Sequence, residues 1–217
     1  MSKLKKIKKL IGHRKYIEPI VDPVIYPNLE KSYAGGSLAD SNILIVSNEP
    51  IEEELINEIE NNENASISLL YKNEKLFAND IIKSGNTLIG PYNHIINVYK
   101  KDGNLPLLSE TGEYPNSDDM YKLYQWLQEE TDYLVNNKLI GSICSIYIGD
   151  NSDYGNVLKK NMEMFALSLG DALANHSIIN NGIIANTCVG VRELLNTAVF
   201  MSSKYGQILG GAIHLIG

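Results

Sequence analysis

From residue 42 to the end of the chain, short apolar runs alternate with longer segments in which apolar residues recur at helical spacing. The runs are apolar throughout rather than at every second position, which is typical of strands buried on both faces. Such strands, separated by helices, predict a parallel sheet that is covered on both sides. Because crossovers between parallel strands are right-handed, the expected α/β architecture is a doubly wound, Rossmann-like parallel sheet with helices on both faces.

The expected elements follow one another without an internal repeat. The predicted strands are residues 42–47, 65–71, 87–90, 94–99, 141–149, 177–185 and 211–216. The predicted helices are residues 48–62, 118–137, 156–175 and 191–205. The chain has 217 residues, of which 44% are hydrophobic, and this is enough for one globular domain with a sizeable core.

The first 40 residues differ from this series and predict a separate N-terminal arm. Residues 16–40 contain three prolines and a Gly-Gly pair, which predicts extended backbone rather than a helix or a buried strand. We therefore expect a basic helix and a Pro/Gly-rich arm over residues 1–40. One Rossmann-like domain is expected over residues 41–217.

The start of this arm is strongly basic. Residues 1–15 contain seven basic side chains and no acid, with Leu4, Ile7, Leu10 and Ile11 at helical spacing. An amphipathic helix of this kind favours weak contact with a membrane surface. The alternatives are a frayed, solvated tail and a helix that docks on a partner protein, and the sequence does not decide among the three.

The remainder of the chain is acidic. Without the seven basic residues of the first 15 positions, 12 basic residues stand against 26 acidic ones, a balance of −14. An acidic body argues against binding to nucleic acid. No apolar run approaches the roughly 20 residues that span a bilayer, and the N-terminus lacks the apolar region of a signal peptide. These features predict a cytoplasmic location, with peripheral contact at the inner face of the membrane as the alternative.

Cysteine and histidine residues do not form a metal-binding pattern. Cys144 and Cys188 both lie in apolar segments, which favours reduced thiols in a cytosolic protein. The four histidines are scattered along the chain at His13, His94, His176 and His214. Because no Cys-x-x-Cys or His-rich spacing is present, we predict no metal site.

The second half of the chain carries several short patterns in a fixed order. Residues 167–186 read LSLGDALANHSIINNGIIAN, and residues 193–217 read ELLNTAVFMSSKYGQILGGAIHLIG. In order and spacing they resemble the short-chain dehydrogenase/reductase family, with Asn181 at the family's strand asparagine and Gly210 at its glycine before the last strand. The resemblance extends over about residues 42–217 and implies a Rossmann fold.

The family's cofactor-binding signals are missing from this sequence. The family binds the dinucleotide pyrophosphate with a glycine-rich turn between the first strand and the first helix. The corresponding residues 46–54, VSNEPIEEE, contain no glycine. They carry four acids, which would repel a pyrophosphate: Glu49, Glu52, Glu53 and Glu54. The loop that borders the cofactor after the fourth strand is predicted at residues 97–100, NVYK, again without glycine. We therefore predict that NAD(P) binding is lost and that no cofactor is bound.

The catalytic pair of the family is also displaced. In that family a tyrosine and a lysine lie four residues apart on one helix face. Matching the apolar face of the helix places the family lysine at Lys159 and the tyrosine at Gly155, while Tyr154 stands one residue early. The family's serine falls near Tyr147 or Ile148. We predict no catalytic residues: Tyr154 is a loop residue near the helix start, and Lys159 is a solvated side chain.

These expectations favour a catalytically inactive homologue, a pseudoenzyme that acts as an oligomeric structural or regulatory subunit. Its expected partner is a second copy or an active short-chain dehydrogenase. The lead-in at residues 25–47 resembles the extension of family members in surface-polysaccharide gene clusters, which implies a role in polysaccharide biosynthesis. One alternative is an active NAD(P)-dependent oxidoreductase that uses Tyr154 and Lys159. Another is a peripheral membrane scaffold that binds through the N-terminal helix.

Association is expected through three retained segments. Family members commonly pair through the regions that correspond to residues 118–137, 156–175 and 205–217. The first of these carries several aromatic side chains around more than one helix face, namely Tyr121, Tyr124, Trp126 and Tyr133. Such amphipathic aromatic residues are favoured at protein interfaces.

Overall fold

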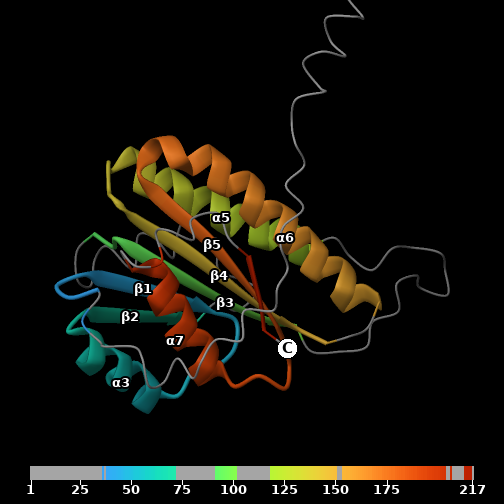
Figure 1. Cartoon of the computed structure of the whole chain (residues 1–217), viewed down its shortest axis with the longest axis horizontal. Coiled ribbons are helices and arrows are strands. Elements are labelled where there is room, and N and C mark those ends of the chain that lie inside the picture. Colours follow the sequence, from blue (N-terminus) through green and yellow to red (C-terminus); the bar gives the residue numbers. More distant parts are fainter. Residues whose placement is uncertain are drawn as a thin grey trace, which may run out of the picture. The chain divides into compact units, whose positions relative to one another are not determined.

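The computed structural model describes residues 36, 38–71, 91–101, 118–150, 153–203, 206 and 213–216. All of these belong to one unit, Ala34–Gly217. Most of the expected N-terminal arm lies outside the described residues, and so does the predicted strand 87–90. Figure 1 shows the described part as a twisted sheet with helices against both faces.

Within the described residues the sheet has six strands. They are β1 (Asn42–Ser47), β2 (Ser66–Tyr71), β3 (His94–Lys101), β4 (Gly141–Gly149), β5 (Ile178–Asn186) and β6 (Ile213–Ile216). Their order is β2-β1-β3-β4-β5-β6, and every neighbouring pair is parallel. The predicted doubly wound parallel sheet is therefore confirmed. The order reverses between β1 and β3, since the chain moves from β1 to β2 on one side and returns to β3 on the other.

Helices cover both faces of this sheet. They are α3 (Glu53–Glu63), α5 (Asp118–Asn136), α6 (Asp153–Leu173) and α7 (Val191–Ser202), and the short 3-10 helix η1 (Ala174–His176) follows α6. α5 and α6 lie side by side on one face, and α3 and α7 lie on the other (Figure 1). Arg192 of α7 forms an ion pair with Glu58 of α3. No helix in the described part of the chain is long and apolar enough to cross a membrane.

Element boundaries agree with the sequence pattern where the pattern is strong. β1 and β4 coincide with the predicted strands. The helix predicted at residues 48–62 begins only at Glu53, because the residues before it form a turn held by side chains. α6 begins at Asp153 rather than at residue 156, so Tyr154 lies in its first turn and not in a loop. The side chain of Tyr154 lies outside the described residues.

The aromatic residues of α5 divide between core and surface. Trp126 and Tyr133 are buried, and the Trp126 ring meets the Tyr99 ring edge-on with centroids 6.2 Å apart. The prediction that these two residues lie at an interface was wrong, because they fill the layer between α5 and the sheet. Tyr124 is 45% exposed, so its predicted place on the inward face of the helix was wrong. The side chain of Tyr121 lies outside the described residues.

Two neighbouring asparagines in β5 fasten one helix to each face of the sheet. The side-chain amide of Asn180 donates to the Ala166 carbonyl of α6 at 2.8 Å. The side-chain amide of Asn181 donates to the Met201 carbonyl of α7 at 3.1 Å. Both side chains are buried, so each bond satisfies an amide that would be costly to leave without a partner. Asn181 is therefore a packing residue. Gly210 lies outside the described residues.

We predict that only one of the two thiols reacts in the native protein. Cys144 is fully buried in β4, and burial raises the pKa of its thiol to about 12, whereas Cys188 is exposed. Because the thiolate is the reactive form, an alkylating reagent at neutral pH should label Cys188 and reach Cys144 only after denaturation. Mass spectrometry of the labelled protein measures this. The folded Cys188→Ser variant is the control and should take up no label, and rapid labelling of that variant would contradict the buried position of Cys144.

Candidate functional site

In a doubly wound sheet, ligands bind at the carboxyl ends of the strands, where the strand order reverses. In this chain that position lies beyond the ends of β1 and β3. Three groups of residues meet this edge: the turn after β1, the end of β2, and the residues that follow β4 and β5.

Asn48, directly after β1, joins the two strand ends at the reversal point. Its side-chain amide donates to the Lys100 carbonyl at 2.8 Å, and its side-chain oxygen accepts from the Lys100 N–H at 2.8 Å. The Asn48 backbone N–H donates to the Val98 carbonyl at 3.3 Å. The Asn48 side chain thus extends the hydrogen bonding between the two parallel strands by one residue beyond the end of β1.

The other donors of the turn are also bonded within the protein. The Glu49 N–H donates to the hydroxyl of Ser47, a buried residue, and that hydroxyl donates to the Glu49 carbonyl at 2.6 Å. Pro50 has no N–H. The Ile51 N–H donates to the Tyr71 hydroxyl at 3.2 Å. A pyrophosphate on a Rossmann turn is held by such backbone N–H groups, and here they already have protein acceptors.

Negative charge surrounds the same turn. Glu52 is the N-cap of α3, and Glu53 and Glu54 occupy its first turn. Acids at this position stabilise the helix by interaction with its dipole, and they take the place that an anionic ligand uses. The acids thus lie at the start of α3, as the sequence pattern indicated, and the repulsion of a pyrophosphate stays a prediction.

Tyr71, the last residue of β2, closes the position where Rossmann folds hold the adenosine ribose. That role usually belongs to an acid about 20 residues after the glycine-rich turn. Here the Tyr71 hydroxyl accepts from the Ile51 N–H and donates to the Ile51 carbonyl at 3.0 Å. These two hydrogen bonds fix the turn after β1 to the end of β2. Sequence reasoning missed Tyr71 and Asn48, since their backbone partners lie far along the chain.

The segment NVYK, residues 97–100, is not a cofactor loop. It lies inside β3, and the Asn97 side chain is buried and donates to Glu130 of α5 at 2.7 Å. The prediction placed the strand end too early, because Lys100 and Lys101 continue the strand beyond its apolar run. The residues after Lys101 lie outside the described part.

Position 155, which corresponds to the family tyrosine, has no room for a side chain. Gly155 is buried in the first turn of α6. A Cβ atom there would lie 2.4 Å from Asp150 Oδ1 and 2.6 Å from the Asp150 carbonyl oxygen. The glycine is required because Asp150, directly after β4, folds back over the helix start.

Lys159 is held in place rather than solvated, so that part of the prediction was wrong. The side chain is half-buried, and its Nζ donates to Oδ1 of Asn186, the last residue of β5, at 2.7 Å. Burial lowers the pKa of Lys159, and the nearby Asp150 and Cys188 oppose this shift. The Lys159 amine is thus hydrogen-bonded to the Asn186 side chain beyond the ends of β4 and β5.

Tyr147 and Ile148, the residues near the family serine, are both buried. The Tyr147 ring stacks on Tyr99 with centroids 6.0 Å apart and lies over Gly149. An added Cβ at Gly149 would be 2.7 Å from Cε1 of that ring. Tyr147 is therefore a packing residue.

None of the described histidines was found among the residues that surround the carboxyl ends of β1 and β3. His94 begins β3 at the opposite, amino end of the sheet, where its Nδ1 lies 2.9 Å from the Ser142 hydroxyl, and burial lowers its pKa to about 4. His214 lies in β6, where burial lowers its pKa. His176 is exposed at the end of η1, and His13 is outside the described residues. No group of three potential metal ligands occurs among the residues that the structure describes.

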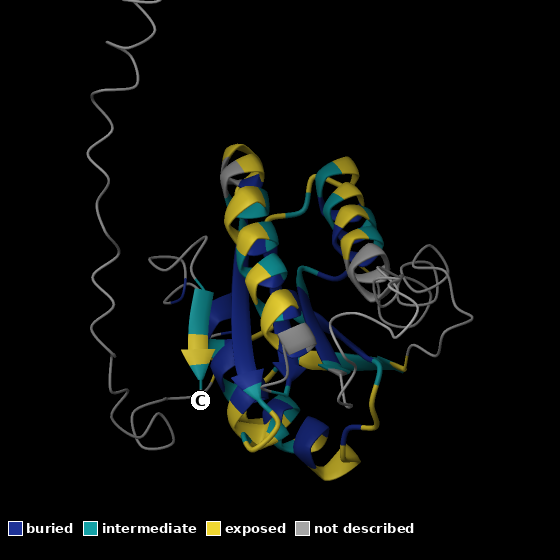
Figure 2. Ribbon diagram, turned by 90° about the vertical axis from the view of Figure 1, so that its right-hand side faces the viewer, coloured by how far each residue is buried: buried dark blue, intermediate teal, exposed yellow. Residues whose placement is uncertain are grey.

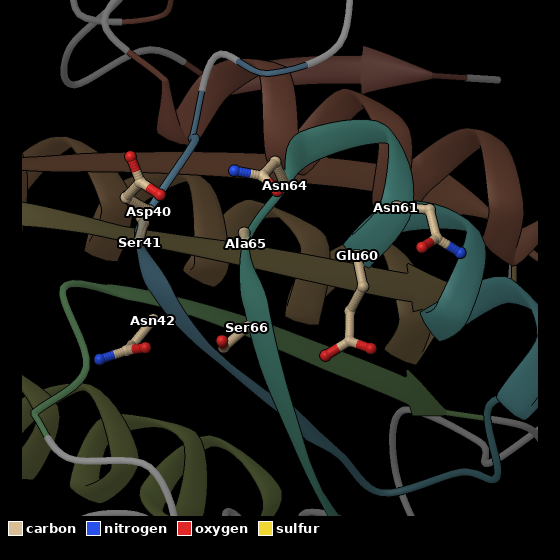
Figure 3. A pocket seen from close by; sticks show the side chains of 8 residues that line it. All are labelled: Asp40, Ser41, Asn42, Glu60, Asn61, Asn64, Ala65 and Ser66. Atoms are coloured by element: carbon tan, nitrogen blue, oxygen red, sulfur yellow. The ribbon is translucent and has the colours of Figure 1, made fainter.

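A polar hollow of about 590 Å³ lies at the amino ends of β1 and β2, next to the C-terminal end of α3 (Figure 3). Its charged side chains are Asp40 and Glu60. Oε1 of Glu60 already accepts from the Ile67 N–H at 2.7 Å. The hollow is at the opposite edge from the strand ends where doubly wound sheets bind dinucleotides.

Comparisons with known proteins identify the architecture. No protein-family model and no curated protein matches the sequence. A short-chain dehydrogenase from Leptospira borgpetersenii serovar Hardjo-bovis, solved with bound NAD+, matches the structure with a TM-score of 0.63 over 83% of this chain and 93% of that chain, at 13% identity. A short-chain dehydrogenase from Mycobacterium smegmatis matches with a TM-score of 0.64 over 85% and 95% of the two chains, at 9% identity.

The fold is that of the short-chain dehydrogenases. L-sorbose reductase from Gluconobacter frateurii, solved with NADPH and L-sorbose, also matches, with a TM-score of 0.59 over 82% of this chain and 95% of that chain, at 10% identity. The short-chain dehydrogenase architecture therefore covers nearly all of the matched chains, although few residues are shared.

We predict that Gly155→Ala destabilises the protein. The added methyl group meets the Asp150 carbonyl, and overpacking of this kind costs about 1–3 kcal/mol. Gly190→Ala is the control for space, because nothing lies within 4 Å of an added Cβ there; Gly190 is the N-cap of α7, where alanine is less favourable than glycine, so a smaller loss of up to about 1 kcal/mol is expected. Urea unfolding of the two variants measures the difference. Equal stability of both would contradict the packing described at position 155.

Proposed function

We propose that this chain is a non-catalytic relative of the short-chain dehydrogenases, which binds no dinucleotide and acts as an oligomeric structural or regulatory subunit. The observation that carries the proposal is the turn after β1, whose backbone N–H groups are hydrogen-bonded to acceptors of the protein itself. The backbone N–H groups of Asn48, Glu49 and Ile51 all donate within the protein. A bound pyrophosphate would break these bonds and then face the carboxylates at the start of α3.

The arrangement beyond β4 supports the same proposal. The resemblance to the short-chain dehydrogenases implies acid–base chemistry by a tyrosine hydroxyl that lies one helical turn before the lysine amine, which is position 155 in this chain. Asp150 fills the space of the side chain at position 155, and the Lys159 amine is engaged with Asn186. Lys159 then serves as a link between α6 and the end of β5.

The proposed partner is a second copy of the chain or an active short-chain dehydrogenase. The resemblance of residues 25–47 to the extension found in surface-polysaccharide gene clusters supports a role in that biosynthesis. Contact of residues 1–15 with the inner face of the membrane would add to such a role, because a basic amphipathic segment is attracted to anionic lipid.

A second candidate is an active NAD(P)-dependent oxidoreductase that uses Tyr154 and Lys159. One observation favours it: Lys159 keeps a fixed, half-buried amine at the carboxyl edge, where catalytic groups of this fold lie. The two candidates differ in whether a dinucleotide binds.

Cofactor titration separates them. We expect NADH and NADPH at millimolar concentration to give no thermal shift and no energy transfer from Trp126, the only tryptophan. A ligand that binds the native state must stabilise it, so a shift of several degrees would overturn the proposal. The Leptospira borgpetersenii enzyme, solved with NAD+, is a suitable positive control under the same conditions.

Substitutions of the displaced pair give an independent prediction. Lys159→Ala should lower stability by about 1 kcal/mol, because it removes one partly buried hydrogen bond. Neither Lys159→Ala nor Tyr154→Phe should change the activity of a co-purified dehydrogenase. Lys160→Ala, an exposed neighbour, is the control for stability. A large loss of turnover in Tyr154→Phe with the fold intact would restore the pair as catalytic.

A further inference from the structure

The polar hollow at the amino ends of β1 and β2 has no part in the proposed function. Its volume of about 590 Å³ lies within the range of roughly 300–1,000 Å³ that small-molecule sites occupy. Four of its eight lining residues are exposed and four are half-buried, so a ligand can reach them from solvent, whereas the central strands are mostly buried (Figure 2). Most small-molecule sites are lined by apolar side chains. Here seven of the eight lining residues are polar and Ala65 is the exception, so a ligand would bind through hydrogen bonds and charge.

Backbone hydrogen bonds fix the walls of this hollow. The Asp40 N–H donates to the Asn64 carbonyl at 3.0 Å, and the Ser66 N–H donates to the Ser41 carbonyl at 3.0 Å. Asp40 and Asn64 have positive φ angles of 60° and 53°, a conformation that aspartate and asparagine adopt more readily than most residues. The hollow is therefore formed before a ligand arrives, which lowers the entropic cost of binding.

The hollow is electronegative for two independent reasons. Asp40 and Glu60 place carboxylates on its wall, and the eight lining residues, all within the described part of the chain, include no basic side chain. The hollow also lies at the C-terminal end of α3, where the helix dipole is negative, and the last turn of α3 has no basic residue to offset it. Because a site of this sign repels anions and attracts cations, the ligand that fits is positively charged.

The acceptors are spread over the hollow, which favours an organic cation over a metal ion. A divalent metal needs several ligands that converge at about 2–2.6 Å, and no group of three potential metal ligands occurs in the described ranges. Figure 3 shows the Asp40 and Glu60 side chains apart from one another, Asp40 ahead of β1 and Glu60 on α3. The Ile67 N–H fixes Oε1 of Glu60 at 2.7 Å, and a carboxylate accepts further hydrogen bonds. Two separated carboxylates match a flexible molecule with more than one ammonium group.

We propose that this hollow binds an aliphatic polyamine, with one ammonium group at Asp40 and another at Glu60. The amide and hydroxyl oxygens of the other lining residues accept hydrogen bonds from the remaining N–H groups. The hollow lies at the opposite edge of the sheet from the turn after β1, so polyamine binding goes beyond the proposed function and does not depend on whether a dinucleotide binds.

Calorimetric titration of spermidine into the full chain at low salt measures this binding. We expect saturable binding to the wild type. Asp40→Asn and Glu60→Gln should each weaken it about fivefold, since each removes one charge pair at a partly exposed position. Both substitutions keep the shape of the hollow, because asparagine also adopts a positive φ and the glutamine oxygen can still accept from the Ile67 N–H.

Glu54→Gln is the matched control for net charge. It removes the same charge from an exposed position in the first turn of α3, at the other end of the helix from the hollow. The spermidine affinity of this variant should stay within about twofold of the wild type, because charges that far apart in solvent are largely screened. Thermal unfolding of each variant without spermidine checks that it is folded.

Three results would overturn the polyamine site. The first is the absence of saturable spermidine binding at millimolar concentration. The second is an equal loss of affinity in Glu54→Gln and Glu60→Gln, which would mean that the acidic body as a whole attracts the amine. The third is displacement of spermidine by Mg²⁺ at equal concentration, which would indicate a metal site. None of these results bears on the proposed function, which fails instead if NADH binds.

Discussion

The side-chain amide of Asn48 holds the carboxyl ends of β1 and β3 together at the point where the strand order of the sheet reverses. A doubly wound sheet is most open at this point, because the chain leaves it in two directions. The turn after β1 follows from that bond: Glu49 is fixed by Ser47 and Ile51 by Tyr71, so the backbone donors find acceptors without a ligand. The first turn of α3 contains acids, which interact favourably with the helix dipole and would repel an anion bound at the same helix end.

The turn after β1 has its backbone N–H groups bonded inside the protein at residues 48, 49 and 51. Backbone N–H groups need partners, and in Rossmann folds that bind a dinucleotide the phosphates accept from some of them. Here the protein supplies all that belong to residues 48, 49 and 51. The helices are fastened in the same internal way, through Asn180 to Ala166 and through Asn181 to Met201. The fold is thus that of the short-chain dehydrogenases, and the turn after β1 is bonded within the protein.

The sequence predicted the architecture well, because buried parallel strands are apolar over their whole length and turns interrupt them. β1 and β4 were placed to the residue. The acidic turn could also be predicted, since it requires only the absence of glycine and the presence of neighbouring acids. The hydrogen bonds between Asn48 and Lys100 could not be predicted from the sequence. The two residues are 52 positions apart, and a single asparagine in a turn has no distinctive pattern. The same reason applies to Lys159 and Asn186, which are 27 residues apart. The end of β3 was misplaced because a strand that ends in two lysines continues past its apolar run.

The most direct test of the closed reversal point is amide hydrogen exchange at residues 48, 49 and 51, measured by NMR with and without NAD+ or NADPH. The account predicts slow exchange of all three amides in the protein alone, as hydrogen-bonded N–H groups show. It also predicts that the cofactor changes neither the exchange rates nor the chemical shifts. Fast exchange at these three positions, followed by protection and shifted resonances on addition of the dinucleotide, would contradict it.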